Sequence, residues 1–293
     1  MTDIQEAYLA ERAELGKQCL ALLDGFPDPR HILSHVFWEN LWCGADGVPH
    51  ALYYEEKPAM RRNVQSFGPL KAPAIETVGG FQRLCVTTNW VLDLRDFSDY
   101  ETWFRALSEN SRKRLRRVHN GLTKAGAVIV PIHDEESFRK FEALYSEQFP
   151  KHPAGSADNR GVWTIYRELE KQGRNFSFLM LDADGNPVAA NLGFIHGKSF
   201  CFTHLTRRKG GPLDRFSPGF YLTCRLVDML YRTRPEVKFF FLGPGKYDYK
   251  PAMLAKPLPV YRCERNSLWN LAGLLRLRHR LARERRLFAQ EEQ

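Results

Sequence analysis

The sequence predicts an α+β domain built around a mixed β-sheet, and three observations carry this prediction. Three short apolar segments in the second half of the chain are separated only by turn-forming residues, which is typical of an antiparallel meander. A helical run then begins at Ser217-Pro218-Gly219, and the apolar segment Phe239–Leu242 follows it. Because a helix between two strands of one sheet is a crossover connection, it packs on one face of a mixed sheet.

Turn chemistry bounds each strand of this sheet. The meander strands are expected at residues 175–181, 188–195 and 200–205, with Asp184–Pro187 and His196–Ser199 as the turns between them. Helical and strand-like patterns alternate in the part of the chain that precedes the meander. Its elements are expected as helices at 101–107, 108–125, 134–149 and 159–172 and a strand at 127–132.

The start of the crossover helix has the composition of an anion-binding site. Ser217 is a good N-cap residue, Pro218 suits the first helical position, and Gly219 lets a bulky group approach the backbone. The backbone amides of a first helical turn have no partner within the helix and bind phosphate. After the next strand, a glycine turn leads to Tyr249 and Lys250. The pattern therefore predicts a phosphate site with a polar pair beside it.

The segment from Trp90 to Lys250 resembles the FemAB-like acyltransferases of the GNAT superfamily, in particular their CelD/BcsL branch. The matching pieces are Leu92-Asp93-Leu94, the basic helix at 111–117, Gly126-Ala127-Val128, the hairpin at 184–190, Ser217-Pro218-Gly219, and Gly245 followed by Tyr249-Lys250. The resemblance implies an acyltransferase with a GNAT-like acyl-CoA N-acyltransferase fold. The expected division is a helix and shortened lobe at 1–89, the acyltransferase domain at 90–262, and a basic amphipathic helix at 263–293.

The resemblance also implies which residues hold the reactants. The co-substrate would be acyl-CoA or acetyl-CoA, and no metal would take part. The residues expected at its pyrophosphate are Arg215, Ser217, Pro218, Gly219, Phe220 and Tyr221. The strand at 200–205 would supply backbone N–H groups to the thioester oxygen.

Three side chains are candidates for the proton transfers of this chemistry. Tyr249 and Lys250 would protonate or stabilise the leaving thiolate, or Lys250 would bind a phosphate. His204, on the edge of a strand, titrates near neutral pH and is a candidate base. Each residue has a structural alternative. His204 would be a hydrogen-bonded core histidine, Tyr249 a packing ring, and Lys250 a solvated cation.

The acyl donor has two candidates. The ordinary GNAT signature R/Q-x-x-G-x-G/A is absent, and FemAB-like relatives can take aminoacyl-tRNA in place of acyl-CoA. The first function expected is transfer from acyl-CoA to an amine or hydroxyl of a small molecule, sugar or lipid precursor. The alternatives are an aminoacyl-tRNA-dependent ligase and a non-catalytic, membrane-associated scaffold with a GNAT-like fold.

Composition favours a folded protein with reduced thiols. The 293 residues are 43% hydrophobic, which is enough for a real core. Six scattered cysteines without a C-x-x-C motif favour free thiols over disulfides or a zinc site. No apolar run approaches the length of a membrane span, and the N-terminus lacks the apolar core of a signal peptide. We therefore expect a cytoplasmic protein, with peripheral contact to the inner membrane face as an option.

Positive charge is gathered in two clusters. The chain carries 43 Lys and Arg against 34 Asp and Glu, a net charge of +9. One cluster lies at residues 105–124, and the other follows Arg265 in a predicted basic helix with leucines as its apolar positions. Such clusters bind anions, here CoA phosphates, tRNA or an anionic membrane surface. The alternative is that each cluster is a solvated helix face.

Overall fold

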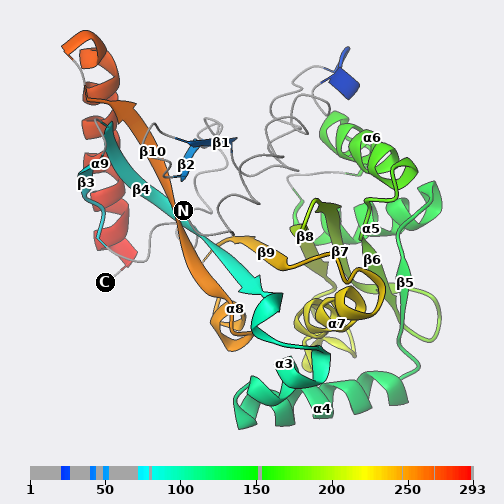
Figure 1. Ribbon diagram of the computed structural model, residues 1–293. Coiled ribbons are helices and arrows are strands. Elements are labelled where there is room, and N and C mark those ends of the chain that lie inside the picture. The colour runs from blue at the N-terminus through cyan, green and yellow to red at the C-terminus, as the bar shows by residue number, and fades with distance from the viewer. Residues whose placement is uncertain are drawn as a thin grey trace.

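Figure 1 shows the computed structural model of the chain. The residues that it describes are 21–26, 40–43, 49–52, 72–78, 81–150, 154–245, 247–266 and 268–291. Most of the predicted N-terminal helix therefore lies outside the described residues. Near the start of the chain, β1 (Asn40–Cys43) and β2 (Pro49–Leu52) pair antiparallel as a separate two-stranded sheet.

The other strands form one eight-stranded sheet with the order β10-β4-β9-β8-β7-β6-β5, and β3 pairs with β4 beside this path. The strand bounds are β3 Ile75–Val78, β4 Phe81–Asp93, β5 Val128–Pro131, β6 Phe178–Leu181, β7 Pro187–His196, β8 Ser199–Arg207, β9 Phe239–Pro244 and β10 Lys256–Arg265. The pairing of β8 with β9 is parallel, and the other pairings in the sheet are antiparallel. The predicted α+β fold with a mixed sheet is confirmed.

Helices cover both faces of this sheet (Figure 1). Their bounds are α3 Tyr100–Ala106, α4 Glu109–Lys124, α5 Glu135–Gln148, α6 Ala157–Lys171, α7 Pro218–Thr233, α8 Tyr249–Ala252 and α9 Leu271–Glu291. One core cluster joins α3, α4 and α7 to Phe200, Phe202 and Phe240 of the sheet. The other joins α5 and α6 to Leu192 and Cys201. The two strands that lead to the predicted site, β8 and β9, thus lie in the middle of the molecule.

The predicted helix starts are confirmed by their caps. The carboxylate of Asp99 accepts a hydrogen bond from the Thr102 amide at 2.7 Å, ahead of α3. Asp134 caps α5 in the same way through the Ser137 amide at 2.8 Å. The first meander strand is shorter than predicted, because residue 175 makes only an isolated bridge and β6 begins at Phe178.

One end of the sheet extends as an arm, which we define as β3, residues 81–88 of β4, β10, the 3₁₀ turn η4 (Leu268–Asn270) and α9 (Figure 1). The carboxyl-terminal end of β4, from Asn89 to Asp93, pairs with β9, residues 81–84 pair with β3, and β10 pairs with β4 from Phe81 to Val91. The sheet therefore includes β3 and the first part of β4, which precede residue 90, the expected start of the acyltransferase domain. The predicted helix at 263–293 was wrong for residues 263–265, which continue β10 because they pair with β4. The helix α9 begins only at Leu271.

Candidate active site

The parallel strands β8 and β9 pair over only a short stretch. Residues 199–201 of β8 face residues 239–241 of β9, and the described residues show no further pairing between the two strands. Both strands continue beyond it, β8 to Arg207 and β9 to Pro244. They therefore separate toward their carboxyl ends, next to the helix α7 that connects them.

Ser217 occupies the N-cap position of α7 without capping it. Its φ is 49°, in the left-handed region, and its side chain makes no cap hydrogen bond. Its Oγ instead accepts a hydrogen bond from Nη2 of Arg114 at 3.1 Å. The prediction that the Ser217 side chain caps this helix was therefore wrong, because the hydroxyl is turned toward α4. Pro218 is the first helical residue, as predicted.

The first turn of α7 keeps open backbone amides. The first hydrogen bond within the helix runs from the Tyr221 amide to the Ser217 carbonyl at 3.2 Å. The amides of Gly219 and Phe220 precede it and belong to the open helix start. A Cβ added at Gly219 would lie 3.6 Å from Leu205, in ordinary van der Waals contact. The side of Gly219 that faces β8 is therefore filled, and a ligand has to approach these amides from another side.

Arg114 is the basic side chain of α4 that reaches this helix start. Besides its bond to Ser217, its guanidinium lies 4.9 Å from the centre of the Phe220 ring. Leu115, Val118 and Leu122 are the buried side of α4, and Arg114 shares a side with Val118 because the two are four residues apart. Arg114 was not among the predicted site residues, although this spacing was a signal that could have identified it.

Two further contacts fix α4 against the α7 region. His119 Nδ1 lies 2.7 Å from the Tyr221 hydroxyl. Gly121 lies so close to Phe216, in the 3₁₀ turn η3 (Asp214–Phe216), that an added Cβ would lie 2.4 Å from its ring. Because only glycine allows this approach, the position of α4, and with it that of Arg114, is set by packing.

The predicted basic cluster at 105–124 divides into separate local contacts. Lys113 forms an ion pair with Glu109 at 2.6 Å, and the Arg116 guanidinium lies over the Phe104 ring. The predicted phosphate ligand Arg215 is exposed, with its guanidinium 4.8 Å from the centre of the Phe216 ring. Two cations, Arg114 and Arg215, thus lie at the start of α7 or just before it.

Lys250 is buried, not solvated. The residue is 1% exposed, and its Nζ donates a hydrogen bond to the Gly243 carbonyl at 2.9 Å. The Nζ also lies 5.2 Å from the centre of the Tyr247 ring. Desolvation by this burial lowers the pKa of Lys250 to about 7. The amine of Lys250 therefore exchanges its proton near neutral pH.

The Tyr249 ring lies next to Phe220, in the first turn of α7, and next to Tyr247, which Lys250 also approaches. Its ring lies edge-on to Phe220 at 6.3 Å and stacks with Tyr247 at 5.9 Å, measured between ring centres. Burial raises the pKa of Tyr249 well above its ordinary value, so its hydroxyl stays protonated. The structure thus places Tyr249 beside Phe220 and the Arg114–Ser217 pair. Tyr247 was not among the predicted site residues.

His204 lies on the other face of the sheet. Its ring meets the Tyr145 ring of α5 at 5.4 Å, and its Nδ1 lies 3.0 Å from Thr203 Oγ1. The reason is a β-bulge, because Leu192 faces His204 but Gly193 faces Phe202, which leaves Thr203 as an extra residue in β8. The bulge reverses the alternation of side chains along β8. His204 is therefore not brought together with Tyr249 and Lys250.

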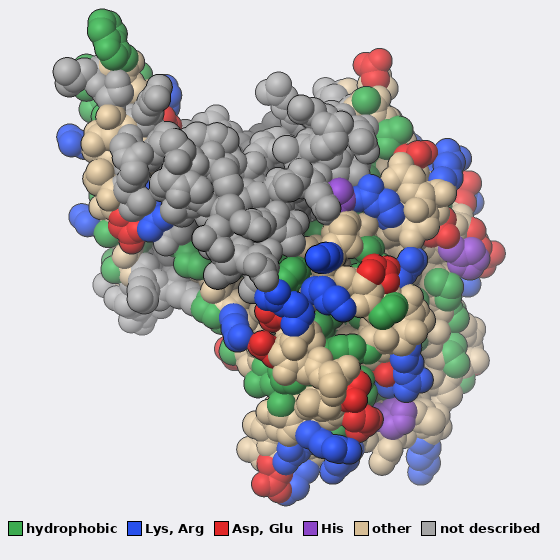
Figure 2. Space-filling view, viewed as in Figure 1, with side chains coloured by type: hydrophobic (Ala, Val, Ile, Leu, Met, Phe, Trp, Pro, Cys, Tyr) green, Lys and Arg blue, Asp and Glu red, His purple; other side chains and the backbone are tan. Residues whose placement is uncertain are grey.

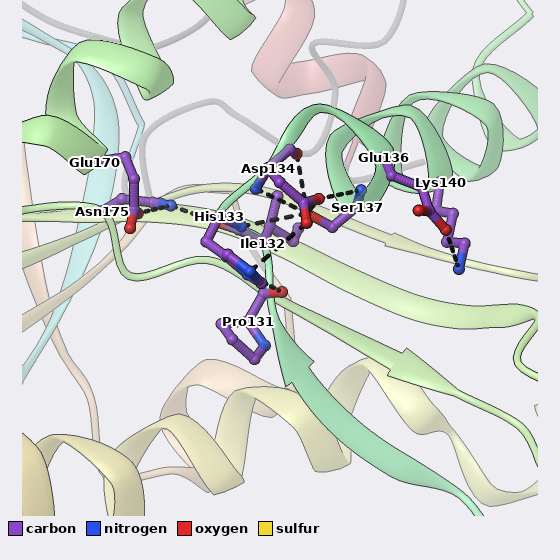
Figure 3. Close-up of polar contacts among 9 residues, drawn as sticks. All are labelled: Pro131, Ile132, His133, Asp134, Glu136, Ser137, Lys140, Glu170 and Asn175. Carbon is purple, nitrogen blue, oxygen red and sulfur yellow. Dashed lines mark hydrogen bonds and ion pairs between the residues drawn. The ribbon is translucent and has the colours of Figure 1, made fainter.

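A separate hollow of about 310 Å³ lies between the end of β5 and the segment that precedes β6. Asn175 Nδ2 donates to Glu170 Oε2 at 2.8 Å, and Ser177 Oγ donates to the Asn175 side-chain oxygen at 2.5 Å. Figure 3 shows Asn175 and Glu170 beside Ile132, whose carbonyl also accepts from Asn175. Because these polar groups bind one another, we assign the hollow a structural role.

Comparison with known proteins finds a family model that matches this region. Residues 109–251, from α4 to α8, match the family model described as an acetyltransferase (GNAT) domain. A comparison with curated proteins gave no match. Within the described part of the chain, no helix is both long and apolar enough to cross a membrane.

Three solved structures are among those to which the chain is similar. L-PGS from Bacillus licheniformis has 12% sequence identity and a TM-score of 0.46 over 90% of this chain and 96% of its own. FemX has 9% identity and a TM-score of 0.46, over 74% and 68%. A tandem GNAT protein from the clavulanic acid biosynthesis pathway has 11% identity and a TM-score of 0.43, over 78% and 63%. At this distance they assign no substrate. Residues 109–251 are thus similar to a GNAT-type acetyltransferase domain.

Proposed function

We propose that this domain transfers an acyl group from acyl-CoA to an amine or hydroxyl of an acceptor. The observation that carries the proposal is the separation of the parallel strands β8 and β9 beside the open start of α7. A helix start of this kind binds a pyrophosphate through its amides. The β8–β9 ladder ends beside it, and N–H groups at the end of such a ladder are of the kind that stabilises a developing oxyanion.

Charge at the helix start supports an anionic donor. Arg114 already donates to Ser217 and covers Phe220, and the exposed Arg215 lies two residues before Ser217. Guanidinium groups bind phosphate oxygens through two hydrogen bonds at once. We assign the pyrophosphate contact to Arg114, Arg215 and the open amides of Gly219 and Phe220.

Lys250 is proposed to carry the proton between the two reactants. The acceptor nitrogen or oxygen attacks the thioester carbonyl carbon, the carbon–sulfur bond breaks, and the sulfur leaves as a thiolate. A neutral Lys250 amine takes the proton that the acceptor loses and gives it to this thiolate. The transfer runs downhill, because the pKa of Lys250 is about 7 and that of an ordinary thiol is about 8.5.

Tyr249 has a different part in this scheme. Because burial raises the pKa of its hydroxyl, the group keeps its proton and donates a hydrogen bond to the thiolate. This role differs from proton donation, the role that the sequence suggested. Direct phosphate binding by Lys250 is disfavoured, since burial lowers the pKa of its amine to about 7 and so weakens its positive charge at neutral pH.

The aminoacyl-tRNA-dependent ligase is the second candidate. Exposed basic side chains remain along α4, among them Arg117 and Lys124, and the ordinary GNAT signature is absent. In that case binding of the RNA would weaken steeply with salt, because counterions are released from its phosphates. The FemAB-like assignment and its CelD/BcsL branch are part of the proposal, as are the cytoplasmic location and an acceptor among small molecules, sugars and lipid precursors.

Calorimetric titration of the full chain separates these candidates. We expect acetyl-CoA or a long-chain acyl-CoA to bind, and an excess of transfer RNA not to displace it. If neither acyl-CoA releases heat and aminoacyl-tRNA binds, the protein is an aminoacyl-tRNA-dependent ligase. If no donor of either kind binds, the GNAT-like fold serves as a scaffold. A screen of amine and hydroxyl acceptors with the donor that binds then identifies the second substrate.

A further inference from the structure

The tip of the arm carries a group of exposed apolar side chains. Trp269 in η4 is 99% exposed, and Leu271 and Leu275 in the first turns of α9 are 58% and 64% exposed. Figure 2 shows hydrophobic side chains at this tip, at the upper left. Elsewhere in the described residues, the exposed large hydrophobic side chains are Val128 and Tyr247, which lie outside the arm. A gathered apolar group of this kind marks a contact surface.

The two leucines lie on the side of α9 that faces away from the sheet. Leu271 and Leu275 are four residues apart and therefore share one side of the helix. Gly273, Leu277 and Glu284 are buried on the opposite side, where α9 packs against β4 and β10. Leu271 and Leu275 therefore do not contribute to the core of this chain.

Packing holds this corner of the arm in place. The Asn270 side chain donates a hydrogen bond to Glu264 of β10 at 3.2 Å, directly beside Trp269. Gly273 approaches the same carboxylate so closely that an added Cβ would lie 2.3 Å from it. Trp269 and Leu271 flank a residue that is tied to the sheet, so their exposure follows from the packed position of the corner.

Positive charge continues the surface along α9. The exposed cations on the helix are Arg276, Arg278, Arg285 and Arg286. The one acidic residue between Leu271 and Arg286 is Glu284, which is 5% exposed and paired with Arg280 at 2.6 Å. The outer side of α9 is therefore apolar at the tip and cationic along the remainder.

We infer that the arm docks on an anionic lipid bilayer, with Trp269, Leu271 and Leu275 entering the headgroup region and the arginines of α9 binding anionic headgroups. Aliphatic and indole side chains beside cations are the composition of a helix that lies in the membrane interface. A nucleic acid offers phosphates to the arginines but no comparable place for two leucines. In a symmetric pair of arms, the arginines of both copies would repel each other. The inference goes beyond the proposed acyl transfer and does not depend on it.

Vesicle flotation with the full chain tests this inference. We expect the protein to float with vesicles of phosphatidylcholine and phosphatidylglycerol, and far less with phosphatidylcholine alone. The triple variant Trp269→Ser, Leu271→Ser, Leu275→Ser should lose about tenfold or more in partitioning, because its apolar contact is removed. Val128→Ser, an exposed apolar residue on β5, is the matched control and should float like the wild type.

A charge variant, light scattering and polyuridine binding distinguish a membrane from the two other possible partners of this surface, a second copy of the chain and a nucleic acid. Arg276→Gln with Arg278→Gln and Arg286→Gln should weaken flotation and reduce its dependence on salt. Wild-type protein that stays unbound to anionic vesicles, or a triple variant that floats like the wild type, overturns the inference. So does a dimer seen by light scattering that the triple variant abolishes while no flotation occurs. Binding of polyuridine that needs the arginines but not the leucines, again without flotation, assigns the surface to nucleic acid. Circular dichroism verifies that each variant is folded.

Discussion

The two faces of β8 bury polar side chains in opposite ways. On the α5/α6 face, Thr203 Oγ1 lies 2.6 Å from the Tyr166 hydroxyl and 3.0 Å from His204 Nδ1, so these polar groups bond to one another. On the α7/α8 face, Lys250 is enclosed near the Tyr247 ring and a main-chain carbonyl, and burial lowers its pKa to about 7. Linked polar groups hold a core together, whereas a buried amine that titrates near neutral pH is suited to proton transfer.

The largest effect is expected at Lys250. Replacing Lys250 by Met keeps most of the buried volume but removes the amine, and we expect turnover to fall about 10²- to 10⁴-fold. In the wild type, turnover should rise as pH increases through 7, because the neutral amine is the acceptor of the proton. The measurement is kcat against pH with saturating donor and acceptor.

Two controls sharpen this prediction. Lys256→Met alters an exposed lysine that pairs with Asp96 at 2.7 Å and should keep full turnover. Lys250→Arg keeps a positive charge but cannot give up its proton, so it should be nearly as inactive as the methionine variant. An active arginine variant, together with wild-type turnover that falls above pH 7, would mean that Lys250 acts as a cation.

The same buried amine should make the free energy of unfolding depend on pH. The folded pKa is about 7 and the ordinary value is 10.5, so between these values the unfolded chain binds more protons than the folded one. Stability therefore rises with pH over this window, and below pH 7 the cost of burying the charge is fully present. Relative to Lys250→Met, we expect the wild type to gain about 2 kcal/mol between pH 7 and 9. Urea unfolding at the two pH values measures this difference, and parallel curves would contradict it.

A smaller loss is expected at Tyr249. Tyr249→Phe removes the hydroxyl and keeps the ring that packs against Phe220 and Tyr247. We expect turnover to fall about tenfold, the loss of one hydrogen bond to the thiolate, with donor affinity and melting temperature nearly unchanged. A variant that loses stability but keeps its activity per folded molecule would show that Tyr249 only packs.

Replacing Arg114 tests whether the acyl donor binds at the start of α7. Arg114→Gln should raise the Kd for acetyl-CoA about 5- to 10-fold through loss of a charge-assisted contact. Arg117→Gln, an exposed arginine on the same helix, is the matched control and should change the affinity little. Equal effects of the two variants would mean that α4 attracts the donor only through its general positive charge. Titration calorimetry at two salt concentrations distinguishes these outcomes.

The smallest effect on turnover is expected at His204. His204→Gln disturbs the bond to Thr203 and the contact with Tyr145, so we expect the free energy of unfolding to fall by about 1–3 kcal/mol. Turnover per folded molecule should stay unchanged, because the residue lies on the α5/α6 face. A large drop in kcat at unchanged melting temperature would assign His204 to the catalytic machinery and reverse the comparison of the two faces.

Local patterns were sufficient for most of the fold. Turn chemistry at Asp184–Pro187 and His196–Ser199 predicted the meander, and the helix begins at Pro218 as expected. These features depend on residues that are close in the sequence, so a single sequence reveals them. The long β4 and the strand at 261–265 were missed, because their pairing joins segments far apart in the chain.

The sequence by itself also determined which residue types line the strand ends and the start of α7. Only the tertiary structure decided which of them meet. The extra residue at Thr203 reverses the alternation of β8 and turns His204 away from α8. Contact across 103 residues turns the Ser217 hydroxyl toward Arg114 and away from its own helix. Burial, which no local pattern reveals, makes Lys250 an amine that titrates near neutral pH, where the sequence had left a site residue and a solvated cation as alternatives. A side chain's chemistry depends on its dielectric surroundings and its neighbours, and both are set by packing between distant segments.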